Sequence, residues 1–160
     1  MELDFALIAD AATVDGSGKL NVLGVFDRIQ ARAFPARHGR IALVLRFSAG
    51  VADAGTHQVE IRLRSPDGTE VLRLDGRMDL RSTGRPDSDQ IKVPHVLNLD
   101  GITFPKEGTY HFDISAGGRS LTSLPLRVEA ASGAGPDARS HGGGRPPPPF
   151  ALGPGGSAQA

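Results

Sequence analysis

Residues 57–79 read HQVEIRLRSPDGTEVLRLDGRMD, the stretch that decides the fold of this 160-residue chain. Apolar and polar residues alternate on both sides of a central turn sequence, Pro66-Asp67-Gly68. A period of two is typical of a strand with one buried and one solvated face, because successive side chains point to opposite sides. Proline, aspartate and glycine preset or tolerate the dihedral angles of tight turns. The stretch therefore predicts a β-hairpin.

The positions of the apolar residues predict the register of this hairpin. Ile61 and Leu63 occupy odd positions, whereas Leu72 and Leu74 occupy even ones. A two-residue turn at Asp67-Gly68 places Leu63 opposite Leu72. Ile61 then lies opposite Leu74, and all four side chains share one face. We therefore expect both strands to contribute to the same core.

The same register gathers positive charge on the outward face. Four arginines lie there: Arg62, Arg64, Arg73 and Arg77. Arg62 falls directly opposite Arg73, and opposed like charges destabilise a sheet by a few tenths of a kcal/mol or more. Glu60 and Asp75 lie diagonally, and their charges would make this an ordinary solvated face. The sharper hypothesis is a patch that binds an anionic ligand or protein partner, because guanidinium groups bind carboxylates and phosphates bidentately. On that hypothesis, Arg73→Glu raises the melting temperature and abolishes partner binding.

Strand patterns continue along the chain. They occur at residues 3–10, 19–27, 41–47, 93–99, 110–114 and 124–128. Helical spacing is not sustained anywhere, and turn sequences at residues 15–18 and 117–118 predict two further hairpins. We expect an all-β fold, a two-sheet antiparallel β-sandwich of about eight strands, either immunoglobulin-like or jelly-roll-like. A closed barrel is the alternative.

Some residues also predict where a strand lies within its sheet. Residues 3–10 and 19–27 are near-continuous apolar runs, so we expect both faces of these strands to be covered and the strands to be central. Pro94 and Pro125 lack the N–H that a ladder needs, so their strands should lie at edges or carry bulges. The change of phase between residues 121 and 124 also indicates a bulge.

The composition narrows the class of partner. With 18 basic and 18 acidic residues, the chain lacks the net positive charge that attracts nucleic acid. No apolar run approaches the ~18–20 residues of a membrane span, and the start of the chain lacks a basic export signal. The absence of cysteine removes disulfides and thiolate sites. We expect a cytoplasmic protein with no nucleic acid and no membrane partner.

A change in composition near Ala130 divides the chain. Residues 131–160 contain eight glycines, six prolines and one aromatic residue. Such a segment buries too little apolar surface to offset the entropy of ordering. We therefore expect a β-sandwich domain over residues 1–130 and a disordered Gly/Pro-rich tail over residues 131–160. The PPPPF sequence at 146–150 also suits a polyproline II ligand, although a low-complexity tail is the simpler interpretation.

Several segments match a known family. They are FALIADA at 5–11, GKLNVLGVFD at 18–27, Phe34-Pro35, Phe104-Pro105 and the pattern Gly108-x-Tyr110-x-Phe112-x-Ile114. Through them, residues 3–128 resemble a bacterial family of uncharacterised small proteins, domain of unknown function 6941. The resemblance implies a β-sandwich and a bacterial source, and it assigns no activity, ligand or catalytic residue. The Gly-x-Tyr-x-Phe run also resembles immunoglobulin-like sandwiches in which a tyrosine hydroxyl binds upstream backbone.

No motif specifies catalysis or a metal. The segment 16–19, GSGK, is similar to a phosphate-binding loop, but Thr13 and Leu20 stand where that motif needs Gly and Ser or Thr. The five histidines, at 38, 57, 95, 111 and 141, lack the spacing of zinc ligands. Asp87 and Asp89 lack the glycine and later glutamate of a calcium loop. We predict no catalytic residue, no metal site and no cofactor.

Two functional hypotheses follow. The first is a non-catalytic binding or assembly module that uses a sheet face, an exposed edge or the end loops to engage a protein or glycan. The second is a small metal-dependent or hydrolytic enzyme on the same scaffold, built from His95, His111 and the acidic residues of the 81–90 loop. His95 is in phase with Val93 and Leu97 on an apolar face, and we expect a local hydrogen bond to satisfy it. The oligomeric state stays open.

Overall fold

The computed structural model describes residues 1–50, 53–80 and 90–131. These residues form eleven strands and no helix. The strands are β1 (Glu2–Val14), β2 (Leu20–Val25), β3 (Arg28–Ala31), β4 (Ala36–Arg37), β5 (Arg40–Gly50), β6 (Gly55–Arg64), β7 (Glu70–Leu80), β8 (Gln90–Asp100), β9 (Thr103–Phe104), β10 (Gly108–Ala116) and β11 (Arg119–Ala130). The eight longer ones match the eight segments that the sequence predicts. The short strands β3, β4 and β9 have two to four residues each, too few to show a period.

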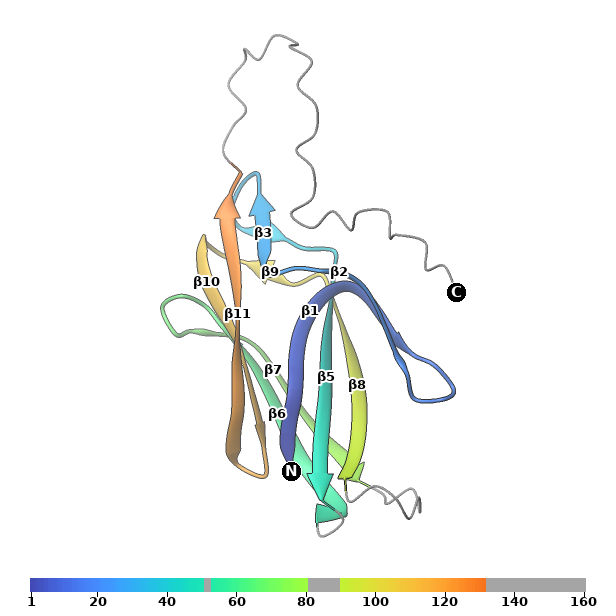
Figure 1. Cartoon of the computed structure of the whole chain (residues 1–160). Coiled ribbons are helices and arrows are strands. Elements are labelled where there is room, and N and C mark those ends of the chain that lie inside the picture. Colours follow the sequence, from blue (N-terminus) through green and yellow to red (C-terminus); the bar gives the residue numbers. More distant parts are fainter. Residues whose placement is uncertain (51–52, 81–89, 132–160) are drawn as a thin grey trace, which may run out of the picture.

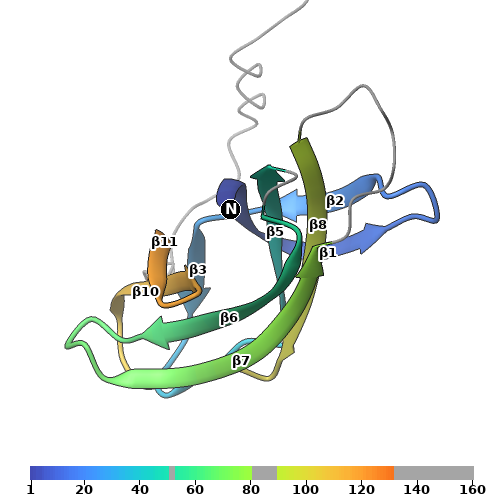
Figure 2. The same cartoon turned by 90° about the horizontal axis from the view of Figure 1, so that it is seen from below.

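Two sheets pack face to face (Figure 1, Figure 2). One sheet has four strands in the order β2-β1-β5-β8, and the other has five in the order β3-β11-β10-β6-β7. The long strands pair antiparallel, while β3 joins β11 in parallel. The predicted two-sheet sandwich is confirmed. A closed barrel is excluded because the described strands form separate sheets with free edges.

Alternation places one side of each strand in the core. On β10, the side chains of Tyr110, Phe112 and Ile114 are completely buried. His111 and Asp113, which alternate with them, stay half-exposed. The four-stranded sheet contributes Ile8, Ile41, Leu43, Leu45, Phe47 and Leu99 to this core, and the five-stranded sheet contributes Ile29, Ile61, Leu63, Tyr110, Phe112, Ile114, Leu126 and Val128.

Tyr110 ties the start of β10 to the backbone that precedes it. Its hydroxyl donates a hydrogen bond to the carbonyl oxygen of Lys106 over 2.8 Å. The ring meets that of Phe104 edge-on, with 4.9 Å between the centroids. A buried phenol therefore keeps its polar atom satisfied while its ring fills the core. This contact confirms the tyrosine arrangement that the Gly-x-Tyr-x-Phe run predicts.

The β6–β7 hairpin has the predicted register with a different turn. The Ser65 N–H donates to the Thr69 carbonyl and the Gly68 N–H donates to the Ser65 carbonyl, both over 2.8 Å. Gly68 has a φ of 84°, which favours glycine. The loop therefore has three residues, not the two expected. A register shift just before it compensates, so Leu63 still pairs with Leu72.

The prolines and the phase change lie as predicted. Pro94 belongs to β8, an edge strand. Pro125 lies on β11 outside the segment 127–130 that pairs with β3, so no described strand lies on that side of it. On β11, Leu121 is skipped between two residues that pair with consecutive positions of β10, which makes a bulge. The edge position of Pro94 and the free side of β11 at Pro125 leave room for the ladder hydrogen bond that a proline cannot donate.

The prediction for the two apolar runs is half wrong. β1 is central, between β2 and β5, and its residues Ile8 and Ala9 are buried. β2 is an edge strand, and Leu23 on it is 72% exposed. The strand covered on both faces is β5, where Ala42 and Val44 have no exposed surface although they point away from the core. β2 is therefore exposed because of its place at the edge of the sheet, which the composition of residues 19–27 does not determine.

Three expectations lie outside the described residues. They concern the 81–90 loop with Asp87 and Asp89, His141, and the tail at 132–160 with its PPPPF sequence. Within the part of the chain that is described, no helix has the length and hydropathy of a membrane-spanning helix.

Candidate functional site

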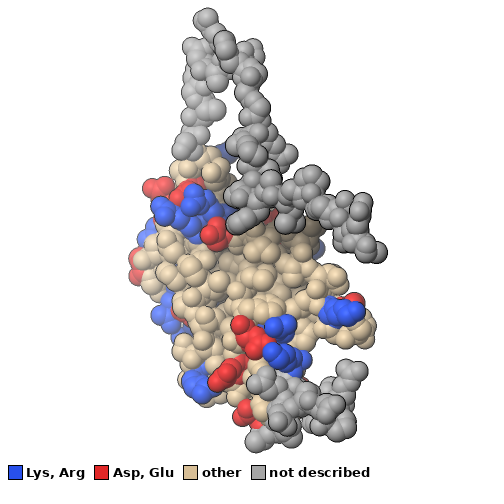
Figure 3. Space-filling model, in the orientation of Figure 1, with Lys and Arg blue, Asp and Glu red and all other residues tan. Residues whose placement is uncertain are grey.

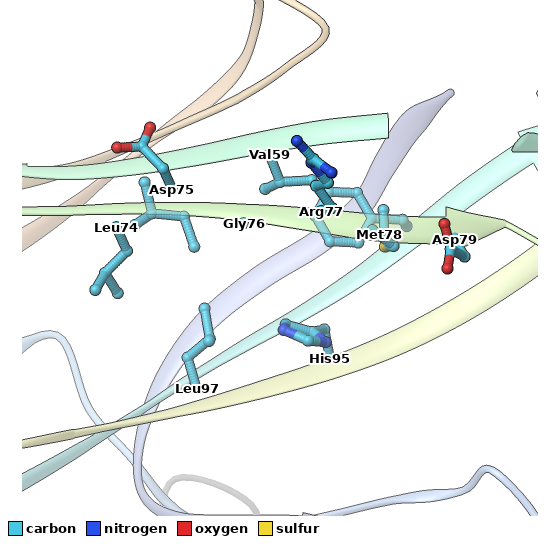
Figure 4. A pocket seen from close by; sticks show the side chains of 11 residues that line it. Val59, Leu74, Asp75, Gly76, Arg77, Met78, Asp79, His95 and Leu97 are labelled. Carbon is cyan, nitrogen blue, oxygen red and sulfur yellow. The ribbon is translucent and has the colours of Figure 1, made fainter. Parts of the chain in front are cut away.

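A cleft of about 410 Å³ opens between the free edges of the two sheets. β8 ends the four-stranded sheet and β7 ends the five-stranded sheet on the same side of the sandwich. The apolar side chains that line the cleft are Phe47, Val59, Ile61, Leu74, Met78 and Leu97 (Figure 4). This volume lies within the ~300–1,000 Å³ range of ligand pockets.

A glycine in the inward row of β7 leaves this space open. Along β7, the alternation that points Leu74 and Met78 inward also points position 76 inward, and the residue there is Gly76. Its partner across the ladder is Val59. A Cβ built on Gly76 would meet no other atom within 4 Å, and its φ is not in the left-handed region. The cleft therefore exists where a side chain is missing from an otherwise apolar row.

His95 supplies the polar group of the opposite wall. It lies on β8 directly across the ladder from Leu45, so its side chain is on the inward face of that strand. The ring keeps an exposed part, and the partial desolvation of the rest lowers its pKa and so favours the neutral imidazole. Among the described residues it has no hydrogen-bond partner, so the local hydrogen bond that we expected is not found. A ring nitrogen is thus available to a ligand at the mouth of the cleft.

The charged residues of β7 point away from the cleft interior. Figure 4 shows the side chains of Asp75 and Arg77 on the opposite side of the β7 ribbon from Leu74. Asp75 pairs with Arg73 over 3.0 Å, and Asp79 accepts a hydrogen bond from the Thr56 hydroxyl over 2.6 Å. The cleft therefore offers apolar walls and one imidazole, a lining that suits an apolar group rather than an ion.

The structure brings Arg62 and Arg73 face to face, as the predicted register requires. Glu60 forms ion pairs with both, and its carboxylate lies 3.3 Å from the Arg73 guanidinium. Asp75 also raises the pKa of Arg73 through a side-chain hydrogen bond. The two arginines are therefore neutralised by neighbours on their own face. An anionic partner for them stays a prediction, and so does the effect of Arg73→Glu on stability, although the new carboxylate would lie beside those of Glu60 and Asp75.

The other two arginines are not part of that pair. Arg64 forms an ion pair with Asp113 on β10 over 3.0 Å. Arg77 has no ion pair among the described residues, and it lies beside the cleft rather than beside Arg62. The four arginines thus share a sheet face without forming one site.

The two histidines of the enzyme hypothesis lie apart. His95 is on the inward face of the four-stranded sheet. His111 is on the five-stranded sheet, opposite Arg64 and Pro125, and it alternates with the core residues of β10. In residues 1–50, 53–80 and 90–131, no three His, Asp or Glu side chains gather closely enough to hold a metal ion. The described residues therefore do not form the constellation that this hypothesis needs.

The family of this chain follows from a family model that matches residues 4–129, more than half of its length. The chain belongs to DUF6941, a family of unknown function. The DUF6941 match begins in β1 and ends in β11, so it contains the cleft and every sheet of the sandwich. The predicted family is confirmed.

Two further comparisons concern curated proteins and solved structures. A search of curated proteins finds no match. Among solved structures, the chain is similar to an immunoglobulin-like protein from Pseudomonas aeruginosa, at 15% identity and a TM-score of 0.36. That likeness covers 79% of this chain and 94% of the other.

Sequence reasoning missed a second surface inside the DUF6941 match. The large exposed hydrophobic residues of the described chain are Val14, Val22, Leu23 and Val25. All four lie on the β1–β2 hairpin. Figure 3 shows a broad uncharged area on this side of the molecule, between groups of charged side chains. The apolar composition of residues 19–27 was the available signal, but it indicated a covered strand.

Proposed function

We propose that this domain is a non-catalytic binding module that holds an extended apolar segment of a protein partner in the cleft between β7 and β8. The observation that carries the proposal is the inward-facing Gly76, which leaves an apolar space of about 410 Å³ between two sheet edges. A bacterial cytoplasmic location is supported by the cysteine-free sequence and the family resemblance. The proposed boundaries of the module are residues 1–130, followed by the tail.

An extended strand suits this cleft better than a compact ligand. No described strand pairs with the outer edge of β7 or of β8. A free edge presents N–H and C=O groups at the spacing of another strand, so a segment that pairs there inserts every second side chain into the cleft. β7 contains no proline, whereas β8 carries Pro94. We therefore assign the main-chain pairing to β7 and the opposite wall to β8.

A substitution that fills the cleft with a side chain of the protein itself tests this proposal. Leucine at position 76 has room for its side chain and no left-handed φ to oppose it. We expect Gly76→Leu to raise the melting temperature, because it buries apolar surface and removes a strand glycine that costs about 0.5–1 kcal/mol. The same change should abolish binding of the uncharged dye N-phenylnaphthylamine, measured by its fluorescence.

Two controls make this result interpretable. Gly39→Leu adds the same side chain at another open position with no left-handed φ, and it should leave dye binding unchanged. A peptide of alternating valine and threonine should displace the dye from the unmodified protein. Dye binding that survives Gly76→Leu overturns the cleft as the binding site. Failure of the peptide to compete overturns the strand as its occupant.

A further inference from the structure

The β1–β2 hairpin is an arm that leaves its own sheet. β1 pairs with β5 as far as Ala9 and with β2 from Ala9 onward. Beyond that point the hairpin crosses the outer face of the four-stranded sheet, and its turn extends past β8 (Figure 1, Figure 2). Ala12 and Leu20 pack there against Val44 and Val96. One side of the arm is therefore fixed to the domain.

The remaining surface of the arm is apolar and uncovered. Leu23 is 72% exposed and Val25 is 63% exposed. β2 ends its sheet, so no described strand pairs with its outer edge. Exposed apolar edge strands are sites of pairing with another chain, and soluble proteins normally protect them with charge or proline. β2 itself contains neither a charged residue nor a proline.

The charges that flank β2 are of opposite sign. Lys19 precedes the strand and Asp27 follows it by two residues. Among the described residues, neither side chain makes an ion pair or a hydrogen bond. Leu23, the most exposed large hydrophobic residue, is the midpoint between them. An antiparallel copy of this segment, centred on Leu23, would therefore present Asp27 to Lys19 and Lys19 to Asp27.

We propose that the arm is a homodimer interface in which two β2 strands pair antiparallel about a two-fold axis at Leu23. A two-fold interface repeats every contact, so the pairing covers two copies of the apolar edge and forms two Lys19–Asp27 ion pairs. The arm lies over the outer face of the four-stranded sheet, whereas the cleft opens on its inner face, so the proposed interface does not depend on the proposed function. A standard interface buries about 800 Å² per partner, more than four side chains expose, so the dimer is weak and concentration-dependent.

The charge pattern provides the first test, by sedimentation velocity of the full chain over a range of concentrations. Lys19→Asp alone and Asp27→Lys alone should each weaken the dimer at least tenfold. Each substitution turns both of the ion pairs across the two-fold axis into pairs of like charges. The double variant Lys19→Asp/Asp27→Lys should restore the dissociation constant. A monomer at every concentration, or a double variant that dimerises no better than the single ones, overturns the proposal. Binding of a different protein in place of a second copy would appear as that monomer.

Disulfide trapping tests the register, since the chain contains no cysteine. Leu23→Cys faces itself across the axis and should cross-link into a dimer under mild oxidation. Val25→Cys is a matched control of similar exposure that faces Asn21 of the second copy, so it should not cross-link. Asn21→Cys/Val25→Cys should cross-link again. Both single variants are at exposed positions, and circular dichroism checks that they fold. Equal cross-linking of Leu23→Cys and Val25→Cys overturns the assigned register.

Discussion

Two strands of the same sheet, β5 and β2, are both rich in apolar residues and have opposite environments. β5 reads RIALVLRFSAG and β2 reads LNVLGV. Leu43 and Val44 on β5 are completely buried, although they point to opposite faces of the sheet. Leu23 and Val25 on β2 are mostly exposed. Apolar content therefore does not separate a strand covered on both faces from an exposed edge.

One contact produces both environments. The arm that β1 and β2 form crosses the outer face of the sheet and covers Val44 of β5. Because β2 forms the far strand of that arm, no described strand pairs with its outer edge. The covering of one strand and the exposure of the other are thus two sides of a single packing arrangement.

The largest expected difference between the two strands is in core stability. Leu43→Ala removes a completely buried side chain and should lower the free energy of unfolding by about 2–5 kcal/mol. Leu23→Ala should change it by less than about 0.5 kcal/mol at concentrations where the chain is monomeric, because that side chain is then exposed to solvent. Urea unfolding of both variants measures the contrast. Similar losses at the two positions would show that β2 is covered in solution.

A smaller effect should come from the contact between the arm and β5. Val44 points away from the core and is buried only because the arm packs over it. Val44→Ala should therefore cost about 1.5–3 kcal/mol, the value for burying such a side chain. Val22→Ala, on the arm itself and 36% exposed, serves as the control and should cost less than half as much. If Val44→Ala proved neutral, the arm would not be packed on the sheet.

The third prediction concerns the charged outer face of the five-stranded sheet, where Arg62 and Arg73 lie opposite each other. Arg73→Glu replaces the partner of Glu60 and Asp75 with a third carboxylate. We expect a small loss of melting temperature, because exposed ion pairs contribute little to stability, and a smaller loss at high salt. Thermal unfolding at two salt concentrations measures it, with Arg77→Glu as a control because Arg77 has no ion pair among the described residues. A gain in stability would support the hypothesis of uncompensated positive charge.

The smallest effect concerns β8, the other edge of the four-stranded sheet. Burial lowers the pKa of His95 below its ordinary value of 6.5. The unfolded chain therefore takes up a proton on His95 at a higher pH than the folded chain does, so acidification through that range removes stability. His95→Gln should reduce the loss of melting temperature between pH 7.5 and pH 5. The other histidines are present in both proteins and cancel in the comparison, so an unchanged pH dependence would place His95 in water.

Which side chains of a strand face the core could be predicted from single segments of the sequence. The inward positions of β10, the pairing of Leu63 with Leu72 and the bulge at Leu121 all follow from a period of two and its interruption. The turn at Pro66-Asp67-Gly68 was expected to be one residue shorter than it is, and a bulge beside it offsets the difference. Phase and register depend on neighbours in the chain and on one hairpin partner, so local patterns determine them.

The candidate site could not be predicted from the sequence in the same way. Gly76 is visible in the sequence as a strand glycine, but the cleft needs β8 of the other sheet to stand opposite it. Glu60 was recognised as a neighbour of the arginines, yet its ion pairs with Arg62 and Arg73 depend on side-chain conformation. His95 was placed on the correct face, but its lack of a hydrogen-bond partner among the described residues depends on what packs around it. Each feature is a contact between segments far apart in the chain.

The sequence by itself determined that this chain forms β-strands, which side of most strands faces the core, where the turns lie and which family it belongs to. These properties come from the alternation of side chains along a pleated backbone, which is a local rule. The tertiary structure decided that β5 is covered twice, that β2 is left at an edge and that a cleft opens beside Gly76. Burial is a property of the space around a side chain, and that space is filled or left empty by strands from elsewhere in the chain.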